Sequence, residues 1–131
     1  MTTRKRAVAI GIPATFIVAV FYWIERPMPT IDLADIAGLE AFADRFWEVA
    51  PSRSRAIYLD DKREWPSEVH RLAPESVRMD SRGIHIKRGK FFVKSWGWFI
   101  LPRGSSFQPR STGDPSYRRI AGRVYSYKIE G

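Results

Sequence analysis

The sequence contains no cysteine, and only two of its 131 residues are histidine, His70 and His85. Without cysteine the chain has no disulfide framework, no thiolate nucleophile and no cysteine-ligated zinc or iron–sulfur centre. Two histidines also leave little material for a histidine-rich metal site. We therefore predict that the protein uses no metal and no cofactor.

The composition shows no sign of a collagenous, repetitive or disordered chain. Glycine and proline account for nine residues each, 44% of the residues are hydrophobic and 14% are aromatic, which is typical of a folded protein. The 22 Lys and Arg residues outnumber the 14 Asp and Glu residues, giving a formal charge of +8. The length is that of a single folded domain.

An uncharged apolar run follows the basic triplet at residues 4–6 and extends over residues 7–24. Eighteen residues span about 27 Å as a helix, close to the ~30 Å hydrocarbon thickness of a bilayer. We predict a cytoplasmic stub and a transmembrane signal anchor over residues 1–26. The anchor residues are Ala7, Ile10, Ile12, Phe16, Ile17, Val20, Tyr22 and Trp23.

Two alternatives to the anchor are a cleaved signal peptide and a buried core helix. A cleavage site needs small residues, but this run ends in VFYWIERP, and a core helix would not be apolar on every face. The basic residues before the run place the N-terminus in the cytoplasm. Residues 27–131 then form an extracytoplasmic domain, held at the inner (plasma) membrane of a bacterium by a single pass.

Residues 32–50 show the periodicity of an amphipathic helix. Apolar side chains recur at spacings of three and four, which puts them on one face that we expect to lie in the core. These residues are Ile36, Leu39, Phe42, Phe46 and Val49. Asp32 fits the N-cap of this helix, and Pro51 fits its end.

A short strand is expected at residues 56–61, followed by a second helix at residues 65–74. Pro66 suits the first helical position, and Trp65, Val69 and Leu72 fall on one face. His70 lies off that face, and we interpret it as a surface residue.

From Ser76 the hydrophobic period changes to two. Residues 76–87 predict a β-hairpin in which His85 and Lys87 alternate with apolar neighbours. The RGK segment at residues 88–90 is expected to turn the chain again.

The last third of the chain is also predicted to form strands. Phe91–Leu101 is apolar on both faces, as in a central strand, with Gly97 as a bulge or bend. A loop at residues 103–117 precedes a final strand, Arg119–Ile129. The predicted fold class is α+β, with two helices followed by a small, mainly antiparallel sheet of three to five strands.

The pattern WPxxVxxLxPxxV from Trp65 to Val77, with the later segments GSSFQPR and GDPSY, resembles patterns in short, membrane-anchored, uncharacterised bacterial proteins. The resemblance covers most of residues 60–131. Its motifs consist of Trp, Pro, Gly and apolar residues, which build a fold. The resemblance supports the domain boundary and implies no activity.

No group of residues matches a catalytic motif. His70 and His85 are the only candidate bases, and no nucleophile turn accompanies them. Asp60, Asp61 and Glu64 could hold a cation, but the interleaved Lys62 and Arg63 favour a solvated turn. We predict that the protein is not an enzyme, and a membrane-surface hydrolase is the least favoured alternative.

One loop offers a weak candidate for anion binding. The backbone N–H groups of residues 104–106, flanked by Arg103 and Arg110, could cradle a phosphate. No nucleotide-binding fingerprint accompanies them.

The charge is strongly segregated along the chain. Residues 27–75 carry 6 basic and 10 acidic side chains, whereas residues 76–131 carry 12 basic and 3 acidic ones. This basic half could contact an anionic surface or could form the solvated face of the sheet. The candidate contacts are Arg78, Arg82, Lys87, Arg88, Lys90, Lys94, Arg118, Arg119 and Arg123.

These patterns favour a non-enzymatic interaction module whose partner is another membrane or periplasmic protein, in an accessory, assembly or immunity-type role. The alternative is that the basic half binds anionic lipid or an acidic polymer. Aromatic residues interleaved with basic ones also suit single-stranded nucleic acid. A domain outside the cell membrane rarely meets nucleic acid, so we do not expect that partner.

Overall fold

The structure is a computed structural model that describes residues 28–49 and 56–131. The predicted anchor, with all eight anchor residues, lies outside the described residues, as does Pro51. Among the helices of the described part, none has the length and apolarity needed to cross a bilayer.

The first helix begins where the sequence predicts. Asp32 accepts a hydrogen bond from the Ala34 amide at 3.0 Å and caps a 3-10 turn, η1 (Leu33–Asp35), which continues into α2 (Ile36–Val49). Ile36, Leu39 and Phe42 are buried on the predicted face. Trp47 and Ala43 are buried beside them, which widens the apolar stripe beyond the predicted one.

The second helix is shorter than predicted. Strand β1 (Ile57–Tyr58) and a second 3-10 turn, η2 (Lys62–Glu64), precede α3 (Ser67–Arg71), with Pro66 at the N-cap. The predicted apolar face is confirmed, because Trp65, Val69 and Leu72 are all buried.

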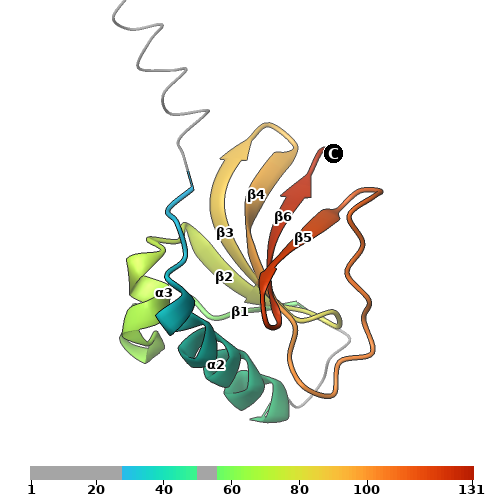
Figure 1. The fold of residues 1–131 in the computed structure, drawn as a ribbon. Helices are drawn as coiled ribbons and strands as arrows, with labels where there is room; N and C mark the ends of the chain where they lie inside the picture. The colour runs from blue at the N-terminus through green and yellow to red at the C-terminus, as the bar shows by residue number, and fades with distance from the viewer. Residues whose placement is uncertain (1–27, 50–55) are drawn as a thin grey trace, which may run out of the picture.

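Six strands form one antiparallel sheet in the order β1-β2-β3-β4-β6-β5. The strands after β1 are β2 (Ser76–Met79), β3 (Ile84–Phe91), β4 (Lys94–Ile100), β5 (Ser116–Ala121) and β6 (Val124–Ile129). The α+β class with two helices and an antiparallel sheet is confirmed, although the sheet has more strands than the predicted three to five (Figure 1).

The predicted turn at residues 88–90 is wrong. These residues continue β3, and the chain turns instead at Phe92 and Val93. The pairing of β3 with β4 shifts register between Lys87 and Gly89, so a β-bulge accommodates the polar RGK segment inside the strand. The predicted central position of β4 is confirmed, because it lies between β3 and β6.

The predicted single strand Arg119–Ile129 is two strands. The chain reverses between Ala121 and Val124, and Gly122 has φ +54° there. Glycine adopts this left-handed conformation without a steric penalty, which permits a tight hairpin. The preceding loop is also shorter than predicted, because β5 begins at Ser116.

Both faces of the sheet are buried at its centre. On one face, side chains such as Ile86, Trp98 and Val124 form the main core with α2 and α3. On the other face, a second cluster is built around Phe99, with Phe107 from the loop after β4 packed against it. The core therefore extends on both sides of β4.

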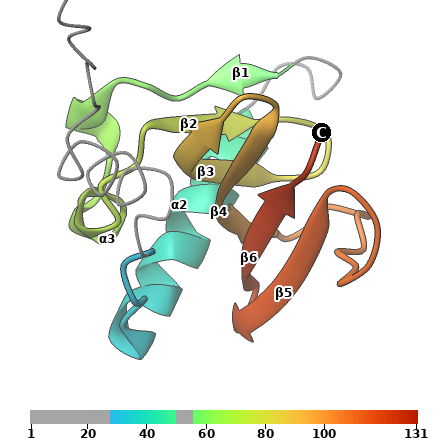
Figure 2. The same cartoon turned by 90° about the horizontal axis from the view of Figure 1, so that it is seen from above.

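The sheet curls away from its helices. His85 of β3 and Tyr117 of β5 approach to 3.0 Å between Nε2 and the hydroxyl oxygen, although β4 and β6 lie between their strands. Three strand spacings would separate them by about 14 Å in a flat sheet. The face opposite α2 and α3 is therefore concave, as the strands in Figure 2 show.

Candidate functional site

A groove of about 360 Å³ lies on the concave face of the sheet. Five of the six strands and the β3–β4 turn contribute to it. We call it the basic groove; its lining residues are Tyr58, Ser76, Arg78, His85, Lys87, Lys90, Phe92, Val93, Ser95, Tyr127 and Ile129. Its volume falls within the range of pockets that hold small ligands or short segments of a partner.

Among the described residues, the lining carries three cationic side chains, Arg78, Lys87 and Lys90, and no acidic one. Two carboxylates approach from outside the lining. Asp80 lies 3.4 Å from an Arg78 nitrogen, and Glu75 lies 3.8 Å from Lys87 Nζ. Because the second separation is long and the side chain of Glu75 is half exposed, that ion pair neutralises Lys87 weakly. The groove therefore favours an anionic ligand.

His85 forms part of the floor of the groove and is only 2% exposed. The predicted alternation sets His85 on the sheet face opposite Ile84 and Ile86, and at His85 this face is buried as well. The second aromatic cluster covers the face, with the Phe99 ring 4.7 Å and the Tyr127 ring 4.9 Å from the imidazole. Tyr117 satisfies Nε2, whereas Nδ1 makes no hydrogen bond within the described part of the chain and lies 3.6 Å from a carboxylate oxygen of Asp80.

Burial determines the protonation state of the side chains that form the floor of the groove. Desolvation lowers the pKa of His85 to about 4. The negative charge of Asp80 opposes this shift, and the positive charges of Arg78 and Arg82 add smaller decreases. Burial also raises the pKa of Tyr117 and of Tyr127. At neutral pH the floor is thus uncharged, and the positive charge of the groove comes from its lysine and arginine side chains.

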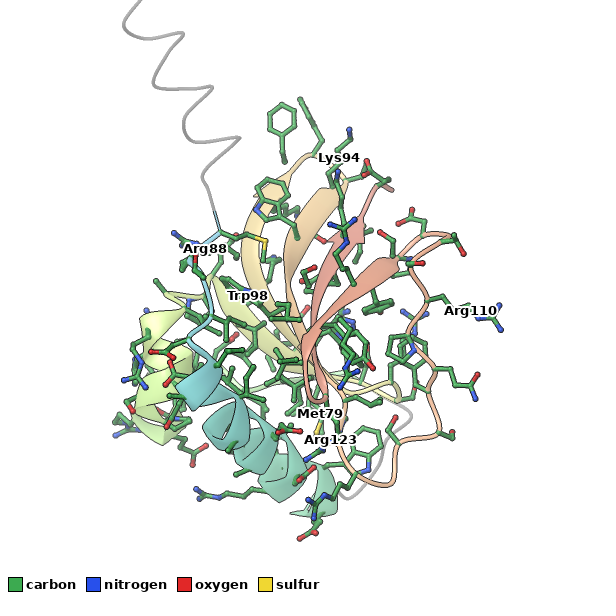
Figure 3. The ribbon with its side chains drawn as sticks, in the orientation of Figure 1. Met79, Arg88, Lys94, Trp98, Arg110 and Arg123 are labelled. Atoms are coloured by element: carbon green, nitrogen blue, oxygen red, sulfur yellow. The ribbon has the colours of Figure 1, made fainter. Side chains whose placement is uncertain are left out.

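The nine predicted basic contacts do not share one surface. Arg78, Lys87 and Lys90 meet in the basic groove, and Lys94 stands at the adjacent end of the sheet (Figure 3). Arg118 lines a different hollow, beside Trp96.

Two further members of the set lie near turns, and another lies at the bulge. The Arg82 guanidinium lies over the Phe107 ring at 5.7 Å. Arg119 donates to the Gly122 carbonyl, and Arg88 donates to the Ala73 carbonyl.

Arg123 has a structural role inside the domain. Its guanidinium donates to Glu40 at 3.0 Å and to the two carboxylate oxygens of Asp44 at 2.7 and 2.8 Å, and also to the Leu101 carbonyl. The hydrogen bonds from Arg123 lower the pKa of Asp44. This cluster joins α2 to the β5–β6 turn at the end of the molecule opposite Lys94 (Figure 3).

No family model, curated protein or solved structure matches this chain. The resemblance to short membrane-anchored bacterial proteins stays a prediction. Functional inference therefore rests on the chemistry of the residues described above.

The weaker candidate sites have local structural roles. In the loop after β4, the Ser105 amide donates to the Pro102 carbonyl and the Phe107 amide donates to Ser105 Oγ, which leaves fewer donors for a phosphate. The Arg103 amide donates to Asp44. These bonds fix the course of the loop and do not form an anion cradle.

The acidic turn is also built from local contacts. Asp60 accepts a hydrogen bond from the Val77 amide, and Asp61 pairs with Arg63. Within residues 28–49 and 56–131, no three His, Asp or Glu side chains are grouped closely enough to hold a metal ion. His70 is exposed, as predicted.

Sequence reasoning identified the cations of the groove but not its remaining walls. Tyr58 and Tyr127 come from β1 and β6, which are far apart in the sequence, and the curl of the sheet brings them to one groove. The alternation of Tyr125, Tyr127 and Ile129 signals an apolar strand face. No local pattern signals that this face is concave.

Proposed function

We propose that this protein is a single-pass, membrane-anchored envelope protein whose outer domain is a non-enzymatic binding module. The anchor is the apolar run at residues 7–24, and the N-terminus is cytoplasmic. The domain binds an acidic segment of another membrane or periplasmic protein in the basic groove. The observation that carries this proposal is the groove itself, whose lining, in the part of the chain that the structure describes, has three cations and no carboxylate.

The shape and chemistry of the groove suit an extended chain. Arg78 and Lys87 lie on adjacent strands of the groove, and Ile129 of β6 adds apolar surface to its lining. Tyr58, which is 63% exposed, stands at the opposite side on β1. A peptide with carboxylates followed by an apolar residue complements this arrangement.

The state of His85 supports binding over acid–base chemistry. A general base must reach the proton that it removes and needs a pKa near the working pH. His85 is buried, its Nε2 is engaged by Tyr117, and its pKa is about 4. We therefore assign it to the framework of the groove.

A titration with a fluorescent poly-glutamate peptide tests the proposal. The full-length protein is held in zwitterionic detergent, and affinity is measured at low and at physiological salt. We expect binding that weakens as salt rises. Lys87→Gln and Lys90→Gln should each weaken it about three- to fivefold, because each removes about 0.6–1 kcal/mol of charge interaction at a partly exposed site.

Arg118→Gln and Lys128→Gln are the matched controls, since they make the same change in net charge outside the groove. They should bind the peptide almost as well as the wild type. Equal losses for both pairs of variants would show a response to overall charge and would overturn the assignment of the groove.

A further inference from the structure

The turn between β3 and β4 exposes an unusual amount of apolar surface. Phe92 is 80% exposed, Val93 is 70% exposed and Phe91 is 38% exposed. The rings of Phe91 and Phe92 contact each other with their centroids 4.5 Å apart. Lys90 and Lys94 flank this triplet, and we call residues 90–94 the tip.

The backbone of the tip makes these residues more unusual. Phe92 has φ +54°, a left-handed conformation that a bulky residue rarely adopts. A two-residue hairpin turn is best formed by Asn-Gly or Asp-Gly. The chain instead places Phe and Val there and leaves both in solvent. Departures of this kind from local preference are found mainly at functional positions.

The tip lies at the end of the domain where the described chain begins. Met28 packs against the core and shares a hollow with Trp96 of β4, and Figure 1 shows the start of the described chain and the β3–β4 turn at the end away from α2. Phe92 is four residues from Trp96, which is about 13 Å along a strand.

The proposed anchor ends close to this point. Ile24 and Met28 are four residues apart in the sequence, so their Cα atoms cannot be more than about 14 Å apart. The tip can therefore reach the bilayer surface from which the anchor emerges. An aromatic and aliphatic triplet between two lysines has the chemistry of a segment that binds the interface of an anionic bilayer.

We propose that the tip docks on the membrane, with Phe92 and Val93 in the interfacial region and Lys94 at the level of anionic headgroups. This inference rests on the proposed anchor. Two attachments, one at Met28 and one at the tip, orient the domain so that the basic groove opens beside the bilayer, where a partner embedded in the same membrane can reach it.

The absence of cysteine permits a direct test. The full chain carrying Val93→Cys is labelled with a nitroxide and reconstituted into vesicles of equimolar phosphatidylcholine and phosphatidylglycerol. Collision rates with oxygen and with a water-soluble nickel chelate give the depth of the label. Ser81→Cys is the matched control, because Ser81 is exposed in the β2–β3 turn at the other end of β3.

We expect an oxygen-to-nickel ratio several times higher at position 93 than at position 81. Adding Phe92→Asn to the labelled chain should bring the ratio at position 93 towards that at position 81. Asn adopts the left-handed conformation more readily than Phe, so this variant should keep or raise its melting temperature, which separates lost docking from lost folding.

Two results would overturn the inference, and only the second would also contradict the proposed anchor. If the chain floats with the vesicles while position 93 is as accessible to nickel as position 81, the anchor stands and the tip faces water or a protein. If the chain does not float with the vesicles, the proposed anchor fails as well.

Discussion

His85 is buried as a neutral imidazole against the rings of Phe99 and Tyr127. Its pKa of about 4 in the folded protein lies below the value of 6.5 for an accessible histidine. At a pH between these two pKa values, the unfolded chain binds a proton that the folded chain does not. The free energy of unfolding therefore decreases as the pH falls. Lowering the pH from 7 to 5 should reduce the free energy of unfolding by about 2 kcal/mol through this group.

His85→Phe should remove this part of the pH dependence. Chemical denaturation at pH 7 and pH 5 measures the free energy of unfolding of both proteins. The difference between the two pH values cancels any constant cost of leaving the Tyr117 hydroxyl without its partner. An equally steep loss in the variant would show that carboxylates, rather than His85, cause the acid sensitivity.

Arg123 yields a second prediction at the scale of single residues. The Arg123 side chain is 22% exposed and bonds two carboxylates of α2. Arg123→Met leaves both carboxylates without their shared partner and should cost about 2–4 kcal/mol in thermal or chemical unfolding. Arg119→Met, in the same hairpin but exposed, should change stability by no more than about 0.5 kcal/mol.

Sequence patterns predict the burial of a residue well when its surroundings follow from the periodicity of the helix or strand that contains it. Helical spacing predicts the Trp65 face, which is buried, and the α2 stripe, of which Ile36, Leu39 and Phe42 are buried and Phe46 is partly buried. The surroundings of His85 and Arg123 come instead from residues that are distant in the sequence, so no local pattern predicts them. The burial of His85 depends on Phe99 and on strands distant in sequence, and the role of Arg123 depends on Asp44, 79 residues away.

At the scale of elements, Gly97 accounts for the close approach of β3 and β4 at the bulge. A Cβ atom on Gly97 would overlap the Ile86 carbonyl oxygen, which belongs to the backbone of the neighbouring strand. The predicted irregularity at Gly97 is found in its partner, where the register shifts after Lys87.

Gly97→Ala should therefore destabilise the protein by about 1–3 kcal/mol, because the two strands must separate locally. Gly38→Ala is the contrasting variant: the atoms nearest to its Cβ would belong to the flexible Glu68 side chain, and alanine is favoured over glycine inside a helix. Melting temperatures should fall for the first variant and stay level or rise for the second. Equal behaviour would contradict the close strand approach.

The hairpins show why element boundaries are harder to predict than element types. The polar RGK segment looks like a turn, yet the bulge absorbs it, while the apolar Phe92 and Val93 form the true turn. Local composition favours the reverse arrangement. The departure marks the tip, which suggests that function rather than folding selects these two residues.

At the scale of the whole molecule, the proposed function places the domain outside the cytoplasm. The basic residues 4–6 outweigh the single basic residue Arg26 on the far side of the apolar run. A reporter that is active only in the periplasm should be active when fused after Gly131, and one that is active only in the cytoplasm should be silent. The opposite pattern would invert the proposed topology.

Photo-crosslinking in intact cells shows whether a partner protein occupies the basic groove. Tyr58 is replaced in the full chain by a benzophenone amino acid, which places the photoreactive group at the exposed side of the groove. If a partner binds in the groove, irradiation should give a discrete protein adduct that disappears when Lys87→Glu is added. Ile120, exposed on β5 outside the groove, is the matched control and should give no such adduct. An adduct that persists with Lys87→Glu, or that forms equally from position 120, would contradict binding in the groove.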